Sequence, residues 1–353
     1  MIKYLGSKRL LLPRILACVH ALPEVRRVLD LFSGTSRVGH ALKGAGYDVV
    51  ANDHNTFAHV LARCYVQADA DRVVAQAQPL LDEFMQLPGE PGYVTETFGI
   101  RARYLHPKNG ARIDAIRRRI GELALDADLE AVCLTSLLEA ADRVDSTTGV
   151  QMAFLKSWAP RALGDLKLRM PAVLPGGGTA LAWDAAEAAA LEPIDVAYID
   201  PPYNQHSYRG NYHVWETIAQ GDEPETYGIA HKRVDCQVFK SHYNSKVRIR
   251  AALEDLVARL RARFLIVSFN NEGFVPREAM ETILRTYGEV ATFEVDFPRY
   301  VGARIGIHNP AGERVGRVSH LRNKEYLFVV STEAGVLPGV QAAMAAFEAQ
   351  RVG

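Results

Sequence analysis

The residues with the clearest chemical use stand in one string, Asp200-Pro201-Pro202-Tyr203, directly after an apolar run at 194–199. The Asp200 carboxylate and the Pro201 carbonyl are two acceptors that can hold both hydrogens of an exocyclic amino group and free its nitrogen lone pair. The two prolines fix the turn, and Tyr203 offers a ring on which a base can stack. The competing interpretation is a stiff turn in which Asp200 only caps a helix.

A second group of useful residues lies near the N-terminus, after the apolar run 28–32. Gly34 and Gly39 have the spacing of the first and third glycines of G-x-G-x-x-G, with Ser36 at the middle place. Such a turn lets a ligand approach the backbone beside a helix N-terminus, and Asp53 ends a second apolar run where a carboxylate can accept from a ribose. This pattern is shared by dehydrogenases and methyltransferases. The alternative is a plain turn in which Asp53 caps the next helix.

Both groups require parallel strands to position them. A strand at 28–32, a helix at 37–45 closed by Gly46 and a strand at 47–52 form a βαβ unit, which implies a parallel sheet with right-handed crossovers. The same alternation returns late in the chain. There the sequence predicts strands at 194–199, 264–269, 291–297 and 325–331, with a helix at 251–263.

Between these halves the sequence becomes helical and charged, with an alanine-rich helix at 126–144 and a Pro/Gly linker at 171–178. We therefore expect a doubly wound, mostly parallel α/β domain made of residues 1–67 and 176–353. Residues 68–175 are expected to form an inserted, mainly helical domain.

Composition narrows the class of protein. The 353 residues are 48% hydrophobic and 23% charged, as in ordinary globular enzymes. Apolar runs fall short of the roughly 20 residues that span a bilayer, and the N-terminus lacks a secretory pattern, so we expect a cytoplasmic protein. The four cysteines and 11 histidines form no metal-binding spacing, which predicts free thiols and no metal. A net charge of +0 leaves room only for local basic surfaces.

Taken together, these motifs resemble the DNA adenine methyltransferases, which include Dam-type (alpha-class) enzymes and the modification enzymes of restriction systems. The segments 208–213 and 268–273 resemble the restriction branch in particular. The resemblance implies a Rossmann-like fold and direct methyl transfer from S-adenosyl-L-methionine to N6 of a flipped adenine. It assigns catalysis to Asp200, Pro201, Pro202 and Tyr203. It assigns cofactor contacts to Tyr4, Lys8, Asp30, Phe32, Ser33, Gly34, Thr35, Asp53 and Asp184. Ser36 departs from the glycine usual at its position.

The inserted segment carries a basic run at 101–119, which contains seven cations and a single acid, Asp114. A second basic run lies later in the chain, at 232–250. Arginine and asparagine can read base edges, and the remaining cations can hold phosphates. We expect DNA contacts from Arg103, Asn109, Arg112, Arg117, Lys240 and Tyr243. The competing interpretation is that each run is a solvated helix face.

Alternatives to adenine methylation remain. Cytosine-N4 methylation uses a similar site, although serine more often replaces the aspartate there, and an RNA substrate would need the same chemistry. A nicotinamide-dependent oxidoreductase would need a complete glycine fingerprint and a general acid. A non-catalytic DNA-binding protein would leave Asp200 without a purpose. Duplex DNA is the expected partner, and a restriction endonuclease that acts separately is the partner expected of the restriction branch.

Overall fold

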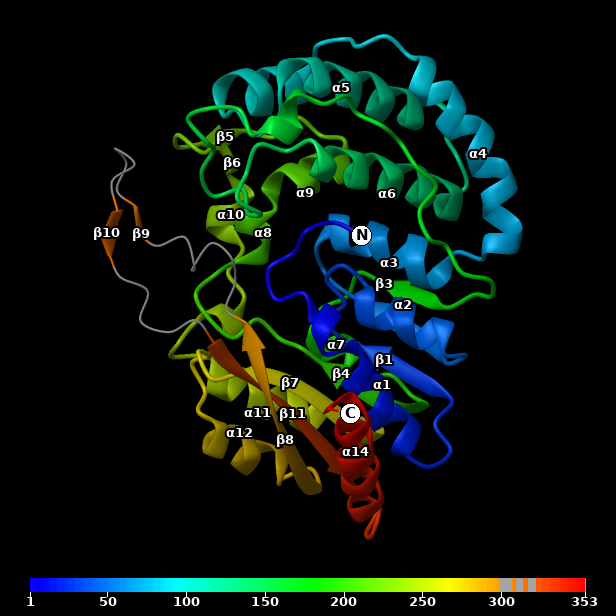
Figure 1. Cartoon of the computed structure of the whole chain (residues 1–353), viewed down its shortest axis with the longest axis vertical. Coiled ribbons are helices and arrows are strands. Elements are labelled where there is room, and N and C mark those ends of the chain that lie inside the picture. Colours follow the sequence, from blue (N-terminus) through cyan, green and yellow to red (C-terminus); the bar gives the residue numbers. More distant parts are fainter. Residues whose placement is uncertain (299–306, 309–313, 317–321, 353) are drawn as a thin grey trace. The chain divides into compact units, whose positions relative to one another are not determined.

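The structure, a computed structural model, describes residues 1–298, 307–308, 314–316 and 322–352 (Figure 1). The chain divides into two compact units. The first comprises residues 1–4, 29–188 and 206–240, and the second comprises residues 5–28, 189–205 and 241–353. The predicted catalytic motif lies in the second unit, whereas the predicted glycine turn lies in the first.

In the described part of the chain the main sheet has seven strands in the order β3-β2-β1-β4-β7-β11-β8. Strands β2 and β3 run parallel, as do β4 and β7, whereas β11 lies antiparallel between β7 and β8. The fold is thus a mixed α/β fold with a mostly parallel sheet, as predicted. The strands are β1 (Arg27–Asp30), β2 (Asp48–Asn52), β3 (Thr179–Leu181), β4 (Ile194–Ile199), β7 (Ala262–Asn270), β8 (Glu289–Pro298) and β11 (Arg322–Ser331).

The first unit is rich in helices, and the long α6 lies at its centre. Asp126 caps α6 by accepting a hydrogen bond from the backbone N of Asp128, and most of the helix is buried against α3, α4, α5 and α9. Figure 1 shows α5 and α6 side by side. The helices are α2 (Arg37–Gly44), α3 (Thr56–Ala62), η2 (Arg63–Gln67), α4 (Ala70–Gln86), η3 (Thr95–Arg101), α5 (Pro107–Glu122), α6 (Ala127–Arg143), η4 (Pro160–Leu163), α7 (Ala185–Ala188), α8 (Tyr208–Asn211), α9 (His213–Gln220) and α10 (Asp235–Val238). Strands β5 (Thr226–Tyr227) and β6 (Lys232–Arg233) form a hairpin.

In the second unit, buried strands β4 and β7 carry nearly continuous apolar sequence, as parallel strands covered on both faces do. Helices α1 and α14 pack together, and Arg14 donates to Glu348 with an Nη2–Oε2 distance of 2.9 Å. The helices of this unit are η1 (Lys8–Leu10), α1 (Leu12–Ala21), η5 (His242–Asn244), α11 (Ile249–Arg259), α12 (Arg277–Leu284) and α14 (Leu337–Val352). Short strands β9 (Ile307–His308) and β10 (Arg314–Gly316) pair antiparallel.

The predicted elements are found with small changes of boundary. The helix expected at 251–263 begins at Ile249 and ends at Arg259, because the strand after it already begins at Ala262. The segment 68–175 is helical as expected and contains one isolated β-bridge, Leu105 with Asp145. It clusters with the glycine-turn strands in the first unit, so its boundaries as a separate domain stay a prediction.

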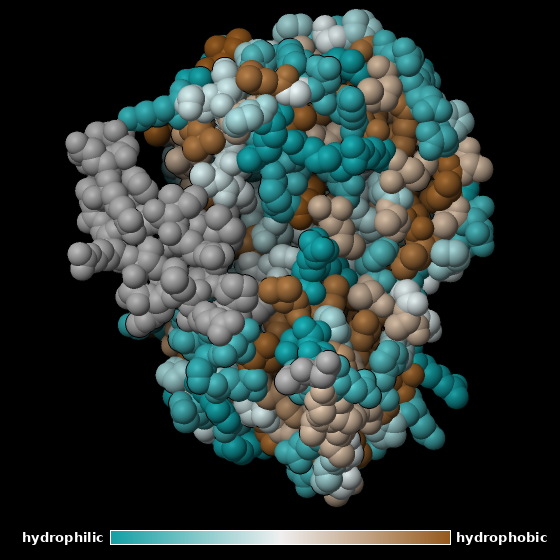
Figure 2. All heavy atoms as spheres, viewed as in Figure 1, coloured by the Kyte–Doolittle hydropathy of each residue, from teal (hydrophilic) through white to brown (hydrophobic). Residues whose placement is uncertain are grey.

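The described residues also bear on the expectations about cysteines, membrane-spanning helices and metal ions. The four cysteines are free thiols, three of them buried and Cys236 partly so. No described helix has both the length and the apolarity to cross a bilayer, and the described His, Cys, Asp and Glu side chains form no group that could hold a metal ion. On the face seen in Figure 2, hydrophilic and hydrophobic residues are interspersed over the helices of the first unit.

Candidate active site

Asp200, directly after β4, shares a buried lysine with a second carboxylate. Lys8 is only 5% exposed, and its Nζ lies 3.0 Å from Oδ1 of Asp200 and 3.6 Å from Oε2 of Glu325 on β11. About a fifth of the Asp200 side chain (19%) is exposed while Oδ1 itself is buried. The accessible part of this carboxyl group therefore lies away from Lys8, where it can accept a hydrogen bond from a ligand.

Tyr203 is held beside this cluster by the loop that follows β7. Its ring packs against Phe269 at 5.5 Å between centroids, and Lys8 Nζ lies 5.8 Å from its ring centroid. The Tyr203 carbonyl accepts a hydrogen bond from Phe274 N at 2.9 Å. A Cβ on Gly273 would lie 2.4 Å from the Phe269 ring, so glycine is needed there. The segment 268–273 thus supports Tyr203, while Pro201 is buried and Pro202 half-buried.

The electrostatics of the cluster follow from burial and from the shared lysine. Burial raises the pKa of Asp200 to about 6; Lys8 opposes that rise and Glu325 adds to it. Burial alone would lower the pKa of Lys8, but Asp200 and Glu325 together raise it well above its usual value. Burial also raises the pKa of Tyr203, which stays a neutral phenol. Near neutral pH the site therefore holds an ammonium and an ionised Asp200 that can still take up a proton.

In the first unit, two carboxylates hold the glycine turn. Asp53 Oδ2 accepts from Gly34 N at 3.0 Å, and Asp30 Oδ2 accepts from Gly39 N at 2.9 Å. Gly34 has φ +51°, and Ser36 has φ +55°, a left-handed conformation that glycine adopts without strain. The structure thus accommodates serine at the position where the sequence departs from the glycine pattern, at a cost of about 1 kcal/mol.

Tyr4 lies over this turn. Its Cε1 would be 3.0 Å from a Cβ on Gly34, and its ring stacks against both Tyr208 and Tyr212 with centroid distances of 5.0 and 4.8 Å. Tyr4, one of the cofactor contacts that the resemblance implied, thus lies beside the glycine turn. Lys8, for which the resemblance implied a cofactor contact, makes ion pairs with Asp200 and Glu325, and its contact with a cofactor stays a prediction.

Asn52, the last residue of β2, connects the chain just after β1 with the chain just after β3. This residue was not singled out from the sequence. Its side chain donates to the carbonyls of Leu31 and Trp183 and accepts from Trp183 N at 3.0 Å. Asp184 is exposed and accepts from Ala186 N at 2.8 Å, which makes it the cap of α7. A polar residue at the end of a strand was the signal that could have pointed to Asn52.

These residues fit a nucleoside cofactor with a cationic tail. Ser33 Oγ is buried and has no hydrogen-bond partner among the described residues, so it is available to a ligand. Asp53 Oδ1 accepts from Asn55 N and Nδ2, both at 2.9 Å, yet each carboxylate oxygen has two lone pairs, which leaves acceptor capacity on Asp53. Phe32 is half-buried and Thr35 is 4% exposed, and both belong to the same turn.

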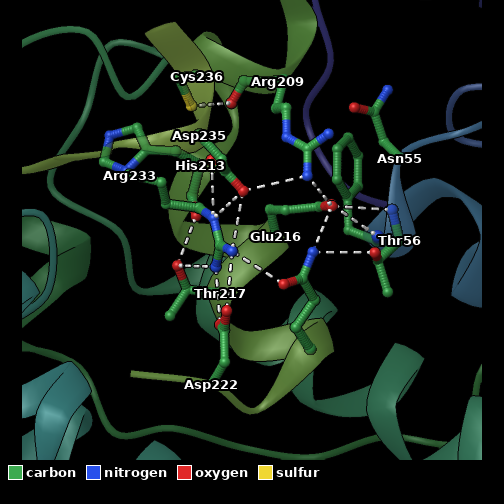
Figure 3. A network of polar contacts seen from close by, with 12 residues as sticks. Asn55, Thr56, Arg209, His213, Glu216, Thr217, Asp222, Arg233, Asp235 and Cys236 are labelled. Carbon is green, nitrogen blue, oxygen red and sulfur yellow. Dashed lines mark hydrogen bonds and ion pairs between the residues drawn. The ribbon is translucent and has the colours of Figure 1, made fainter. Parts of the chain in front are cut away.

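A polar network, drawn in Figure 3, fixes the segment 206–240 that follows the predicted catalytic motif in sequence. Glu216 is buried and accepts from the backbone N of Thr56 and of Phe57, both at 3.1 Å, so it caps α3 from another helix. Arg233, at the base of the β5–β6 hairpin, is 4% exposed and pairs with both oxygens of Asp222 at 2.7 and 2.8 Å. Arg233 was part of the second basic run, but the structure buries it.

Three of the predicted DNA contacts make hydrogen bonds within the protein. Asn109 is 1% exposed and holds the loop at 162–166 through its amide. Arg112 donates to the Met85 carbonyl at the end of α4, and Arg117 donates to three carbonyls at the end of α9. These contacts stabilise the fold. They give each of the three side chains a structural role that does not require DNA.

The other three predicted DNA contacts lie nearer the surface. Arg103 is partly exposed, and its guanidinium lies 4.7 Å from the Trp158 ring centroid. Lys240 is exposed and Tyr243 half-buried. Acids outside the basic run pair with four of its cations: Arg101 with Glu96, Lys108 with Asp165, Arg118 with Glu90 and Arg119 with Glu83. The local excess of positive charge is therefore smaller in the fold than in the sequence.

Comparison with known proteins decides the family. Residues 4–283 match the family described as D12 class N6 adenine-specific DNA methyltransferase. The chain belongs to this family. The match includes the glycine turn, the Asp200 motif and Lys8, whereas Glu325 lies beyond it.

Three curated relatives of this family member carry the names of methylases or methyltransferases. Modification methylase StsI of Streptococcus sanguinis is 31% identical over 324 residues, which cover 86% of this chain and 49% of that protein. Type II methyltransferase M.FokI of Planomicrobium okeanokoites is 30% identical, with 83% and 48% covered. Type II methyltransferase M.NlaIII of Neisseria lactamica is 29% identical, with 84% and 90% covered. The chain thus spans about half the length of the first two relatives and most of the third.

Proposed function

We propose that this chain transfers a methyl group from S-adenosyl-L-methionine to N6 of adenine in duplex DNA, as an enzyme of the Dam-like alpha class. The observation that carries the proposal is the ionisable Asp200, open on one side and paired with Lys8 on the other, at the end of β4 in a member of the D12 class family. Amino-group methylation requires an oriented acceptor of this kind.

The first unit supplies the cofactor residues in this proposal. Ser33 Oγ, which has no hydrogen-bond partner among the described residues, is available to the ligand, Asp53 can accept from the ribose hydroxyls, and the exposed Asp184 can accept from the adenine amino group. Asp30 accepts a hydrogen bond from Gly39 N, and its negative charge favours a ligand with a cationic tail. When bound, S-adenosyl-L-methionine supplies an electrophilic methyl group.

The second unit supplies the residues for the target base. We assign the two amino hydrogens of a flipped adenine to the Asp200 carboxylate and the Pro201 carbonyl, with the ring of Tyr203 as the stacking surface. The two hydrogen bonds draw the amino hydrogens out of the plane of the base ring, so that the nitrogen lone pair is localised and points toward the methyl group. Rate enhancement then comes from positioning and electrostatics.

DNA recognition falls to residues 68–175 and to the segment after the catalytic motif. Arg103, Lys240 and Tyr243 are the surface contacts we propose, whereas Asn109, Arg112 and Arg117 support the fold beneath such a surface. The relatives named as type II methyltransferases and modification methylases support a role in the cytoplasm that protects DNA from a separate restriction endonuclease.

The test is to incubate the protein with duplex DNA and isotopically labelled S-adenosyl-L-methionine and to identify the modified nucleoside by mass spectrometry. N6-methyladenine is the expected product. N4-methylcytosine would overturn the choice of base, and methylation of RNA alone would overturn the choice of substrate. Bound cofactor without transfer to any nucleic acid would overturn the assignment of an active enzyme.

A further inference from the structure

The burial of Glu325 carries an inference about the Asp200 site, and it rests on the proposed methyl transfer. We propose that Glu325 is a positioning residue for the reaction: by sharing Lys8 with Asp200, it keeps the site net negative while the target amino nitrogen becomes positively charged. Neither the family match, which ends at residue 283, nor the sequence motifs assign it a role.

Glu325 is an acidic residue buried within the sheet, and its burial needs a physical explanation. It lies in the middle strand of the antiparallel part of the sheet, opposite Asn270 of β7 and Val295 of β8, and it is 4% exposed. Its Oε2 lies 3.6 Å from Lys8 Nζ and makes no hydrogen bond to a described residue. A buried carboxylate oxygen that is compensated by a lysine shared with Asp200 is costly to the fold, as expected of a group retained for its charge.

The charge count explains what Glu325 adds. A site with Lys8 and ionised Asp200 alone would be neutral, and Lys8 would cancel the field of the acceptor that it holds in place. With Glu325 ionised as well, the three side chains sum to one negative charge. Lys8 can then orient Asp200 without neutralising the site.

The negative charge is needed at a defined step. The nitrogen lone pair forms the N–CH3 bond as the S–CH3 bond breaks and its electron pair stays on sulfur. The nitrogen then carries a positive charge until one of its hydrogens leaves as a proton. Asp200 Oδ2, which already accepts that hydrogen in our proposal, takes the proton and later gives it to solvent. A net negative site lowers the energy of the charged nitrogen throughout this step.

Other groups around Asp200 are consistent with this role. Lys8 of η1 and Glu325 of β11 act on Asp200 directly, and the phenols of Tyr198 and Tyr203 face Lys8. Glu272, after β7, adds negative charge on the side of Tyr203. Burial raises the pKa of Asp200 to about 6, and Glu325 contributes to that rise, so removal of the Glu325 charge should lower the pKa of Asp200.

The experiment compares Glu325→Gln with the wild type in single-turnover methylation at saturating duplex DNA and S-adenosyl-L-methionine, from pH 5 to 9. Glutamine keeps the volume and removes the charge. We expect the rate on the plateau to fall about tenfold or more, the acid limb to move to lower pH, and the Kd of the cofactor to stay within about twofold. Glu294→Gln is the matched control, since Glu294 lies on β8 and pairs with Lys324 at the surface.

A second readout does not depend on turnover. Carboxyl 13C NMR of the cofactor-free protein should show a lower titration midpoint for Asp200 in Glu325→Gln than in wild type, and Glu325→Asp should restore most of it because the charge remains. An unchanged midpoint, or an unchanged plateau rate and pH profile, would overturn the role of Glu325. If the wild type transfers no methyl group, the proposed function fails, whereas the NMR titration still decides whether Glu325 acts on Asp200.

Discussion

Replacing Asp200 by alanine is expected to separate methyl transfer from folding at this site. The variant removes the carboxylate that lies 3.0 Å from Lys8 Nζ but leaves Glu325 at 3.6 Å as a partner for the ammonium. In a medium of effective dielectric about 20, each contact corresponds to roughly 5 kcal/mol of gross attraction. The loss at Asp200 is offset because a buried carboxylate and its repulsion with Glu325 disappear too. We expect a net change in unfolding free energy of about 1 kcal/mol.

The effect on catalysis should be much larger. Without Asp200, one of the two amino hydrogens has no acceptor and the site loses negative charge, which corresponds to a rate loss of about 10³. The assay is single-turnover methylation of duplex DNA, with the cofactor Kd from calorimetry and the unfolding free energy from urea titration. Transfer should be lost while cofactor affinity and stability persist. If all three are lost together, Asp200 is a structural cap and the proposed chemistry is refuted.

Three further predictions follow from other contacts. In the wild type, single-turnover rates should fall as pH drops below about 6, because protonation of Asp200, whose pKa is raised to about 6, removes the acceptor; a flat profile down to pH 5 would contradict this. Glu216→Ala should lower the unfolding free energy by about 3 kcal/mol in urea titration, since two backbone N–H groups and Arg209 lose their acceptor, whereas exposed Glu225→Ala should change it little. Tyr4→Ala should raise the cofactor Kd about tenfold in calorimetry, because the stacked ring over the glycine turn is lost; Tyr4→Phe should retain affinity, and equal losses in both variants would point to the hydroxyl instead.

Local sequence was a good guide to individual elements. Strand β4 has the predicted bounds, and α2 ends two residues before Gly46, whose φ of +90° suits a glycine. These elements depend on short-range features: apolar runs that favour buried strands, capping residues, and turns that need glycine or proline. For the same reason the Asp200 motif and the glycine turn could be recognised before their surroundings were known.

The basic run at 101–119 shows where local sequence was a poor guide. Along the sequence, the run contains seven cations and one acid. In the fold, acids outside the run form ion pairs with several of these cations. Arg112 and Arg117 donate hydrogen bonds to the last carbonyls of α4 and α9. A helix end needs donors for its last carbonyls, but the sequence does not say which helix end lies within reach of which arginine.

The sequence by itself indicated the class of chemistry to which the family match points, because the aspartate, two prolines and tyrosine of the motif are contiguous and can be recognised without knowledge of the fold. Tertiary structure alone decided how that aspartate is tuned. Lys8 comes from the N-terminal segment and Glu325 from β11 near the other end of the chain, and folding brings both charges to one buried site. Coulomb interactions depend on distance in space and on burial, and neither quantity can be read along a sequence.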